Sequence, residues 1–394
     1  MSGIGKFFQA RKGAKAFLAL PQEQRKITFY SEDTHSIIYF QGLIDALTGK
    51  LGQQICYLTS DPSDPILATQ NPRIKSFFVG DSSARTMLFV QMTADVLIMT
   101  MPDLDTFYIK RSKAHPVHYV YVFHSMVSVH SQYLKGAFDH FDTIFCTGSY
   151  QCDEIRETEK TYGLPEKRLL KFGYHRLEAL MDDVRRHRQR SRGLDTEGPR
   201  RVIVAPSWGN EAILEVCGGQ LVQILLYAGY TTIVRPHPMT VKRTPEVIDQ
   251  LRKRFQRHEG FQLQIDIRDT STLYESHVMI SDWSGVALEY AFGCERPVIF
   301  IDVPKKNRNP ECSAIPNVPI EVSIREKIGR VVSPQNLDGL PTAIEEIYAD
   351  MGNFVDQIRA VREQTVFNLG SSGQVGAAYI AELTSTVPTT GKAC

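Results

Sequence analysis

Arg201-Val-Ile-Val-Ala-Pro-Ser-Trp-Gly209 is a short apolar run that ends abruptly in a polar, turn-rich segment. The same plan recurs in Thr231-Thr-Ile-Val-Arg-Pro-His-Pro238 and in Val278-Met-Ile-Ser-Asp-Trp-Ser-Gly285. Each run has the length of a buried strand and precedes a stretch with a helical pattern. Such alternation predicts a parallel sheet of βαβ units, whose ligands bind in the loops beyond the carboxyl ends of the strands.

The alternation continues on both sides of a charged segment at 183–200, which has few apolar residues and ends in Gly198-Pro199. That composition is typical of a linker, with a cluster of arginines facing solvent or an anion. The expected fold class is α/β, with two Rossmann-like domains, 1–182 and 201–394, facing across a cleft. The last helix of the chain is long enough to pack back on the first domain. Strands are expected at 26–30, 54–59, 76–79, 95–101, 118–124, 143–147, 201–205, 231–235, 261–265, 278–281 and 297–302.

Length and composition agree with this plan and exclude several classes of protein. A chain of 394 residues suits two domains, and its net charge of +1 provides no general attraction for nucleic acid. The seven cysteines are an odd number without a C-x-x-C pair, which argues against a disulfide framework or a zinc site. Neither a signal peptide nor an apolar run of about 20 residues is evident, so a cytoplasmic protein is expected.

Residues 4–20 interleave basic and apolar side chains and predict a short amphipathic helix. Two interpretations remain open. The helix could hold the protein peripherally on the inner, anionic face of the cell membrane. The simpler alternative is a leading helix that packs on its own domain.

The segment Ser281-Asp-Trp-Ser-Gly285 suggests a phosphate site at the start of a helix. Ser281, Asp282 or Ser284 can cap that helix, and its free N–H groups together with a permissive Gly285 suit an anion. Glu289, further into the helix, could reach a ribose or a base edge. A plain N-cap before a core helix would have the same pattern.

Two histidines also follow predicted strands. In the segment that ends at Pro238, two prolines hold Arg235, a planar fork for phosphate, beside His237, which can donate a hydrogen bond or carry a proton. In the first domain, the strand at 118–124 delivers His124 to its carboxyl end, where it could act as a general base. Ser207 and Trp208 occupy the equivalent position after another strand. Neither G-x-G-x-x-G nor a P-loop occurs.

Taken in order, Phe123-His124-Ser125, Ala205-Pro-Ser-Trp208, Arg235-Pro-His-Pro238 and Ser281-Asp-Trp-Ser-Gly-Val-Ala-Leu-Glu-Tyr290 resemble the CDP-glycerol glycerophosphotransferases, the teichoic-acid and capsule polymerases and primases of the GT-B fold. The resemblance spans roughly residues 117–302. It implies that His124 is the catalytic histidine on the acceptor side and that His237, supported by Arg235, faces the donor phosphates. It also implies that Ser284 and the helix start hold the pyrophosphate, that Ser207 and Trp208 line the donor pocket, and that Glu289 lies near the ribose.

The chain departs from the family pattern in the first and in the last of these four motifs. The family usually has W-H-G where this chain has Phe123-His124-Ser125, and a second Ser where it has Gly285. No metal motif is evident and no cofactor is expected, although a divalent cation could stimulate the reaction.

Three functions are compatible with these residues. The first is transfer of a polyol phosphate from a CDP-linked donor to a hydroxyl of a saccharide, lipid-linked or polymeric acceptor in teichoic-acid-like or capsule synthesis. The second is glycosyl transfer from a nucleotide-sugar, and the third is nucleotide binding without catalysis. Nucleic acid is not an expected partner.

Overall fold

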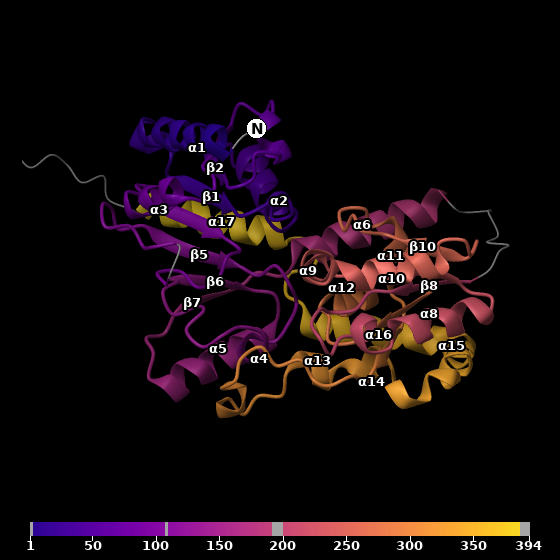
Figure 1. The fold of residues 1–394 in the computed structure, drawn as a ribbon. Coiled ribbons are helices and arrows are strands. Elements are labelled where there is room, and N and C mark those ends of the chain that lie inside the picture. Colours follow the sequence, from indigo (N-terminus) through magenta and orange to yellow (C-terminus); the bar gives the residue numbers. More distant parts are fainter. Residues whose placement is uncertain (1–2, 107–108, 191–199, 387–394) are drawn as a thin grey trace, which may run out of the picture.

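The computed structural model describes residues 3–106, 109–190 and 200–386, which form two α/β domains side by side (Figure 1). The sheet of the first domain has the strand order β3-β2-β1-β4-β5-β6-β7, with parallel neighbours throughout. Its strands are β1 Ile27–Ser31, β2 Ile55–Thr59, β3 Ile74–Phe78, β4 Val96–Met99, β5 His118–Val122, β6 Thr143–Cys146 and β7 Arg168–Lys171.

The second domain repeats this topology in the order β10-β9-β8-β11-β12-β13, again with parallel neighbours. Its strands are β8 Arg201–Val204, β9 Thr231–Val234, β10 Phe261–Leu263, β11 Val278–Ser281, β12 Val298–Ile301 and β13 Gly329–Val332. In both sheets the strand order reverses beside the first strand, at β1/β4 and at β8/β11. Ligands of doubly wound sheets bind at such a reversal.

Helices cover the sheets, and apolar side chains fill the layers between them. In the first domain they are α1 Gly3–Leu18, α2 Ile37–Asp45, α3 Ser83–Val90, α4 Val129–Gln132 and α5 Ser149–Tyr162, with shorter turns η1 Gln22–Gln24, η2 Ala46–Lys50 and η3 Pro65–Ala68. Then follow α6 His175–Arg190, α7 Ile213–Val216, α8 Gly218–Tyr227, α9 Pro238–Arg243, α10 Pro245–Phe255, α11 Ser271–Glu275, α12 Val286–Cys294, η4 Cys312–Ala314, α13 Ile320–Ser323, α14 Arg325–Ile328, η5 Pro334–Gly339, α15 Leu340–Ala349, α16 Met351–Thr365 and α17 Ser372–Thr386.

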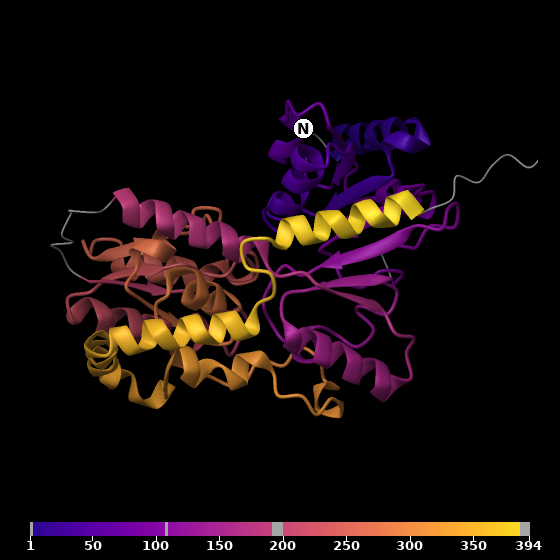
Figure 2. The same ribbon diagram turned by 180° about the vertical axis from the view of Figure 1, so that it is seen from behind.

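The chain crosses between the domains twice. After β7 it enters α6, which packs against α12 of the second domain, and after α16 it returns as α17, which packs against α2 of the first (Figure 2). The return is tight, because a Cβ on Gly373 would lie 2.5 Å from the carbonyl carbon of Gly42. Tyr379 anchors α17 through a 2.8 Å hydrogen bond between its hydroxyl and that of Thr143.

All the expected strands are present, but the segment expected to be a linker is partly helical. Residues 183–190 form the second half of α6, and 191–199 lie outside the described residues. The charged composition obscured a helix whose buried face carries Leu177, Leu180 and Val184 and whose arginines from Arg185 onward are exposed. The helical segment that follows β8 is divided into α7 and α8 at Cys217, whose φ is −144°, directly before two glycines.

Candidate active site

The loops that follow β8 and β11 meet where the strand order of the second sheet reverses. Asp282 is buried there, and its carboxylate accepts hydrogen bonds from the backbone N–H groups of Ser207 (2.6 Å) and Ile213 (3.2 Å). The hydroxyl of Ser281 donates to the carbonyl of Ala205 at 2.7 Å. Both polar groups therefore shape the loop that carries Trp208, and neither is directed at a ligand. Ser284 is buried as a residue, and its hydroxyl makes no hydrogen bond among the described residues.

Three cations surround the ring of Trp208. Lys306 Nζ lies 4.3 Å from the ring centroid and donates to the Trp208 carbonyl at 2.6 Å. The Cζ atoms of Arg243 and Arg308 lie 5.0 and 5.5 Å from the same centroid. Burial, together with the charge of Arg308, lowers the pKa of Lys306 to about 8. Cations gathered around one half-buried aromatic ring create a local positive potential that suits an anionic ligand.

His237 lies beside this cluster as the N-cap of α9. Its Nδ1 accepts the backbone N–H of Met239 at 3.0 Å, and its ring centroid is 6.1 Å from that of Trp208. Burial and the charges of Lys306 and Arg308 lower the pKa of His237 to about 3. The ring is therefore neutral, and because Nδ1 accepts a hydrogen bond, its proton is on Nε2. His237 offers a hydrogen-bond donor to the site.

Arg235 does not present its guanidinium to this site. Nη1 donates to Gln264 Oε1 (3.0 Å) and to the carbonyl of Asp269 (2.7 Å), and Nη2 donates to the carbonyl of Ile267 (2.7 Å). Burial lowers its pKa to about 10. Arg235 thus fastens the loop 264–272 beneath the Pro236-His237 turn, and the expected contact with phosphate is replaced by this supporting role.

His124 approaches from the first domain, directly after β5. Its Nδ1 lies 3.3 Å from the Tyr121 hydroxyl, and its ring packs against Tyr39 and Tyr133 at centroid distances of 6.1 and 6.0 Å. Burial lowers its pKa, and Arg308 adds to this effect. The charge of His124 in turn contributes to the lowered pKa of His237, so the fold brings the two predicted histidines within electrostatic reach.

Glu289 takes part in a buried network that joins the domains. Its Oε2 accepts from Arg176 Nε at 2.7 Å, and its Oε1 accepts from the Tyr174 hydroxyl at 2.8 Å. The same hydroxyl lies 3.0 Å from the carbonyl oxygen of His124. The pKa of Arg176 is raised by this carboxylate despite burial. Glu289 is thus engaged in an ion pair and a hydrogen bond within the protein, and the Tyr174 hydroxyl lies between its carboxylate and the backbone of His124.

A strap from the second domain delivers Lys306 and Arg308, which the sequence interpretation missed. The loop between β12 and α13 lies against α4: Arg308 N donates to the carbonyl of Ser131 (2.9 Å), Gln132 Nε2 to that of Lys306 (2.9 Å) and Asn309 Nδ2 to that of His130 (2.9 Å). The basic run from Lys305 to Arg308 follows a predicted strand, as the other site segments do. That position was the signal that could have identified it.

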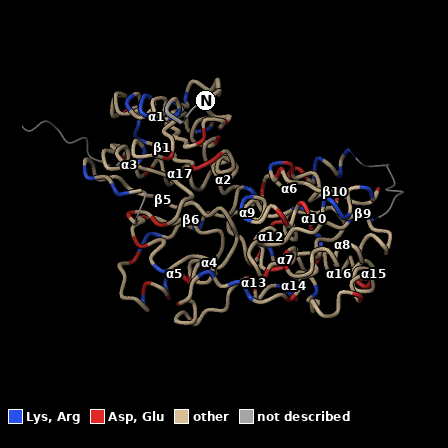
Figure 3. The backbone as a smooth tube through the Cα atoms, viewed as in Figure 1, with Lys and Arg blue, Asp and Glu red and all other residues tan. Residues whose placement is uncertain are grey.

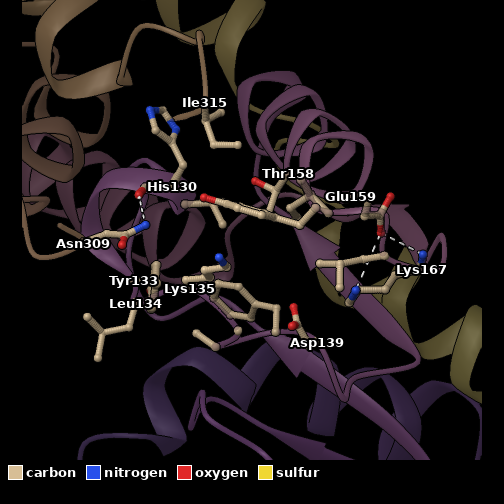
Figure 4. Close-up of a pocket in the computed structure, with 17 residues that line it drawn as sticks. His130, Tyr133, Leu134, Lys135, Asp139, Thr158, Glu159, Lys167, Asn309 and Ile315 are labelled. Atoms are coloured by element: carbon tan, nitrogen blue, oxygen red, sulfur yellow. Dashed lines mark hydrogen bonds and ion pairs between the residues drawn. The ribbon is translucent and has the colours of Figure 1, made fainter. Parts of the chain in front are cut away.

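A separate recess of about 470 Å³, including its open mouth, lies between α4, α5 and this strap (Figure 4). Apolar side chains dominate its lining, with Asn309 and Ile315 contributed by the strap. None of the predicted site residues lines it, so it is not the donor site. In the part of the chain that the structure describes, no group of three or more His, Cys, Asp or Glu side chains could hold a metal ion.

Comparisons with known proteins agree with the fold. No protein-family model matches the sequence, and no curated protein sequence matches it. Among solved structures, the wall teichoic acid polymerase TagF is 14% identical with a TM-score of 0.62, over 98% of this chain and 99% of that chain. A glycosyltransferase from Rickettsia africae ESF-5 is 11% identical (TM-score 0.51; 92% and 100% covered). UDP-GlcNAc 2-epimerase from Neisseria meningitidis, bound to UDP-GlcNAc, is 10% identical (TM-score 0.53; 90% and 99% covered). The chain therefore has the GT-B architecture of two Rossmann-like domains.

Proposed function

We propose that this protein transfers a polyol phosphate, such as glycerol phosphate, from a CDP-activated donor to an acceptor hydroxyl. The observation that carries the proposal is the pairing of a neutral His237, with its proton on Nε2, and three cations around Trp208, opposite His124 of the other domain. This arrangement suits an anionic, phosphate-linked donor on one side and a hydroxyl on the other. A variant of TagF has also been solved after soaking with CDPG.

In the proposed reaction, the acceptor oxygen attacks the phosphorus that bears the polyol. His124 takes the acceptor proton at Nε2 in the tautomer whose Nδ1–H donates to the Tyr121 hydroxyl oxygen. A new phosphodiester forms as the P–O bond to CMP breaks. His237 Nε2–H, Lys306 and Arg308 stabilise the negative charge on the departing phosphate.

The unpaired hydroxyl of Ser284 and the start of α12 complete the donor side of this proposal. The backbone N–H groups there carry the positive end of the helix dipole. Trp208 and Ser207 line the donor pocket, whereas Arg235, Ser281, Asp282 and Glu289 position it. No metal or cofactor takes part in the proposed step, and a divalent cation could still stimulate it.

Product analysis tests the proposal directly. With CDP-glycerol and a glycerol-phosphate primer as acceptor, we expect CMP release matched by a new phosphodiester. The alternative, glycosyl transfer, has the support of the glycosyltransferase and UDP-GlcNAc epimerase neighbours and would give UDP and a glycosidic bond from UDP-GlcNAc. CMP release from neither donor, combined with tight binding of CMP, would indicate a nucleotide-binding protein without catalysis.

We also propose that α1 holds the protein on an anionic membrane surface near a lipid-linked or polymeric acceptor. The buried face of α1 carries Ala10, Ala14 and Phe17 and packs on α3 and β3. Its exposed side carries Phe7 and Phe8 among the basic side chains Lys6, Arg11, Lys12 and Lys15, whose blue bands are visible in Figure 3. No helix among the described residues has the length and apolar character that crossing a membrane requires.

Vesicle sedimentation tests the role of α1. We expect the protein to sediment with phosphatidylglycerol vesicles and not with phosphatidylcholine vesicles, and the Phe8→Ser and Lys12→Gln changes together to abolish this binding. Equal sedimentation of the variant and the unchanged protein would contradict the proposal.

A further inference from the structure

A second cationic recess, of about 770 Å³ including its open mouth, lies between the second half of α6, the end of α12 and α16. Its lining includes Arg185, Arg188, Gln189, Arg362 and a single carboxylate, that of Glu295. No residue of the candidate active site is part of it. Three guanidinium groups facing one carboxylate leave the recess with excess positive charge.

The single carboxylate of the recess, that of Glu295, is shared by three arginines. Its Oε2 accepts from Arg188 (3.2 Å) and Arg359 (2.7 Å), and its Oε1 accepts from Arg362 (3.2 Å). Although burial raises the pKa of Glu295, the bonds from Arg359 and Arg188 lower it to about 2. The remaining acids nearby, Asp182 and Asp356, have side chains that are 59% and 84% exposed, so water screens their charges.

Arg362 is the buried member of the group and is incompletely paired. It is only 7% exposed, and its Nη1 donates to the carbonyl of Phe292 (2.7 Å) as well as to Glu295. Its Nε is buried without a partner among the described residues. Burying a cation without full pairing is costly, and an anion in the recess would offset that cost. Arg185 and Arg188, whose side chains are 67% and 51% exposed, stand at the mouth, where Arg185 Nη1 pairs with the exposed carboxylate of Asp182 at 3.2 Å.

We propose that this recess binds a phosphate ester through Arg185, Arg188 and Arg362. Guanidinium groups bind phosphate oxygens in a bidentate manner, and several around one recess select a dianion over chloride. The proposal does not depend on the transfer reaction, because it rests on residues of the recess alone. A free phosphate ester and a lipid headgroup share this chemistry, and the experiment distinguishes them.

Calorimetry with inorganic phosphate at constant ionic strength tests the site. The full-length variant that combines Arg243→Gln, Lys306→Gln and Arg308→Gln removes all three cations around Trp208, so that binding at the recess is observed alone. We expect this background to bind one phosphate, and the further changes Arg185→Gln and Arg188→Gln to weaken binding at least tenfold. Arg186→Gln removes one charge from the same helix but not from the recess, so it is the matched control for the single change Arg185→Gln.

Two results would overturn the proposal: no phosphate binding in the background variant, or equal weakening by the control and the recess variant. Arg188 also donates to the carbonyl of Cys294, so Arg185→Gln alone serves as a second variant that leaves this contact intact. A weakening by Arg185→Gln that exceeds that of Arg186→Gln supports the site. Loss of binding to phosphatidylglycerol vesicles, with binding of glycerol 3-phosphate unchanged, would assign the arginines to a membrane surface and reject the recess as a site for free phosphate esters.

Discussion

Ser125 of the first domain and Gly285 of the second are in contact across the domain interface. A Cβ at position 285 would collide with the Ser125 hydroxyl, and it would lie 3.0 Å from Val127 Cγ1 and 3.5 Å from Ser125 Cβ. Compared with the family pattern described above, this chain has a larger residue at position 125 and a smaller one at position 285. The two residues therefore share one space in the interface. Each accommodates the other, beside the start of α12 and the backbone of His124.

We expect Gly285→Ser to destabilise the protein by about 1–2 kcal/mol, because the new side chain overpacks the interface. Combining it with Ser125→Gly should restore most of the loss, since the double change returns the volume. Urea unfolding of the two single variants and the double variant gives the interaction energy. Additive effects would show that the two positions are independent.

Replacing His237 separates its two roles. His237→Asn keeps a side-chain acceptor for the Met239 N–H, so α9 should stay capped, whereas His237→Ala loses the cap and about 1 kcal/mol of stability. Both variants lack the Nε2 donor and should lower kcat about 100-fold or more. CMP release and thermal unfolding measure the two effects. An active His237→Asn variant would exclude His237 from catalysis.

The charge of Lys306 should make donor binding dependent on pH. Because its pKa is lowered to about 8, the ammonium is lost as pH rises through that value, and affinity for CDP-glycerol should fall several-fold between pH 7 and pH 9. Lys306→Arg keeps its charge over this range and should flatten the profile. Titration calorimetry at both pH values provides the comparison, and an unchanged slope in the arginine variant would rule out Lys306 as its source.

The pair formed by Glu289 and Arg176 should behave as a structural unit. Glu289→Gln leaves a buried guanidinium without its carboxylate and should cost about 3 kcal/mol of stability. Arg176→Gln should cost a similar amount, and the double variant should cost less than the sum. If Glu289 instead contacted the ribose, the Gln variant would raise KM for CDP-glycerol without lowering stability, and denaturant unfolding with steady-state kinetics separates these outcomes.

Glu321 makes the domain interface sensitive to pH. Its Oε1 accepts the Ser128 N–H at 3.0 Å, and burial, with the nearby Glu154, raises its pKa from 4.5 to about 7. Between these values the folded state keeps a proton that the unfolded state loses, so stability falls as pH rises from 4.5 to 7 and remains lower above. Glu321→Gln should therefore stabilise the protein by about 2–3 kcal/mol at pH 8 and hardly at pH 4.

The exposed Glu326→Gln change on neighbouring α14 is the control for this titration and should have little effect at either pH. Unfolding by urea at pH 4 and pH 8 measures all three proteins. A stabilisation by Glu321→Gln of equal size at both pH values would mean that ionisation of Glu321 is not its cause.

Much of the fold could be predicted because its signals are local. Apolar runs such as Val202–Val204, followed by turn residues and a helical pattern, define parallel strands and the loops at their carboxyl ends. Edge strands β7 and β13 were not predicted, because two of the four positions in each are exposed and neither is a continuous buried apolar run. Part of the linker expected at 183–200 is helical. The helix was not predicted because the arginines of α6 outnumber the two leucines and the valine that pack it against the protein.

The same distinction between local and long-range signals applies to the candidate site. The sequence by itself determined that His124, His237 and Trp208 follow strands, because the polarity of a parallel sheet places all such loops at one edge. Only the tertiary structure decided which polar groups are free: Arg235 is engaged by carbonyls of the loop 264–272, and Glu289 is paired with Arg176. Their partners come from segments far away in the chain. The position of Lys306 beside Trp208 has the same cause. The strap that carries Lys306 is held by hydrogen bonds to α4 of the first domain, and a local sequence pattern does not predict such contacts.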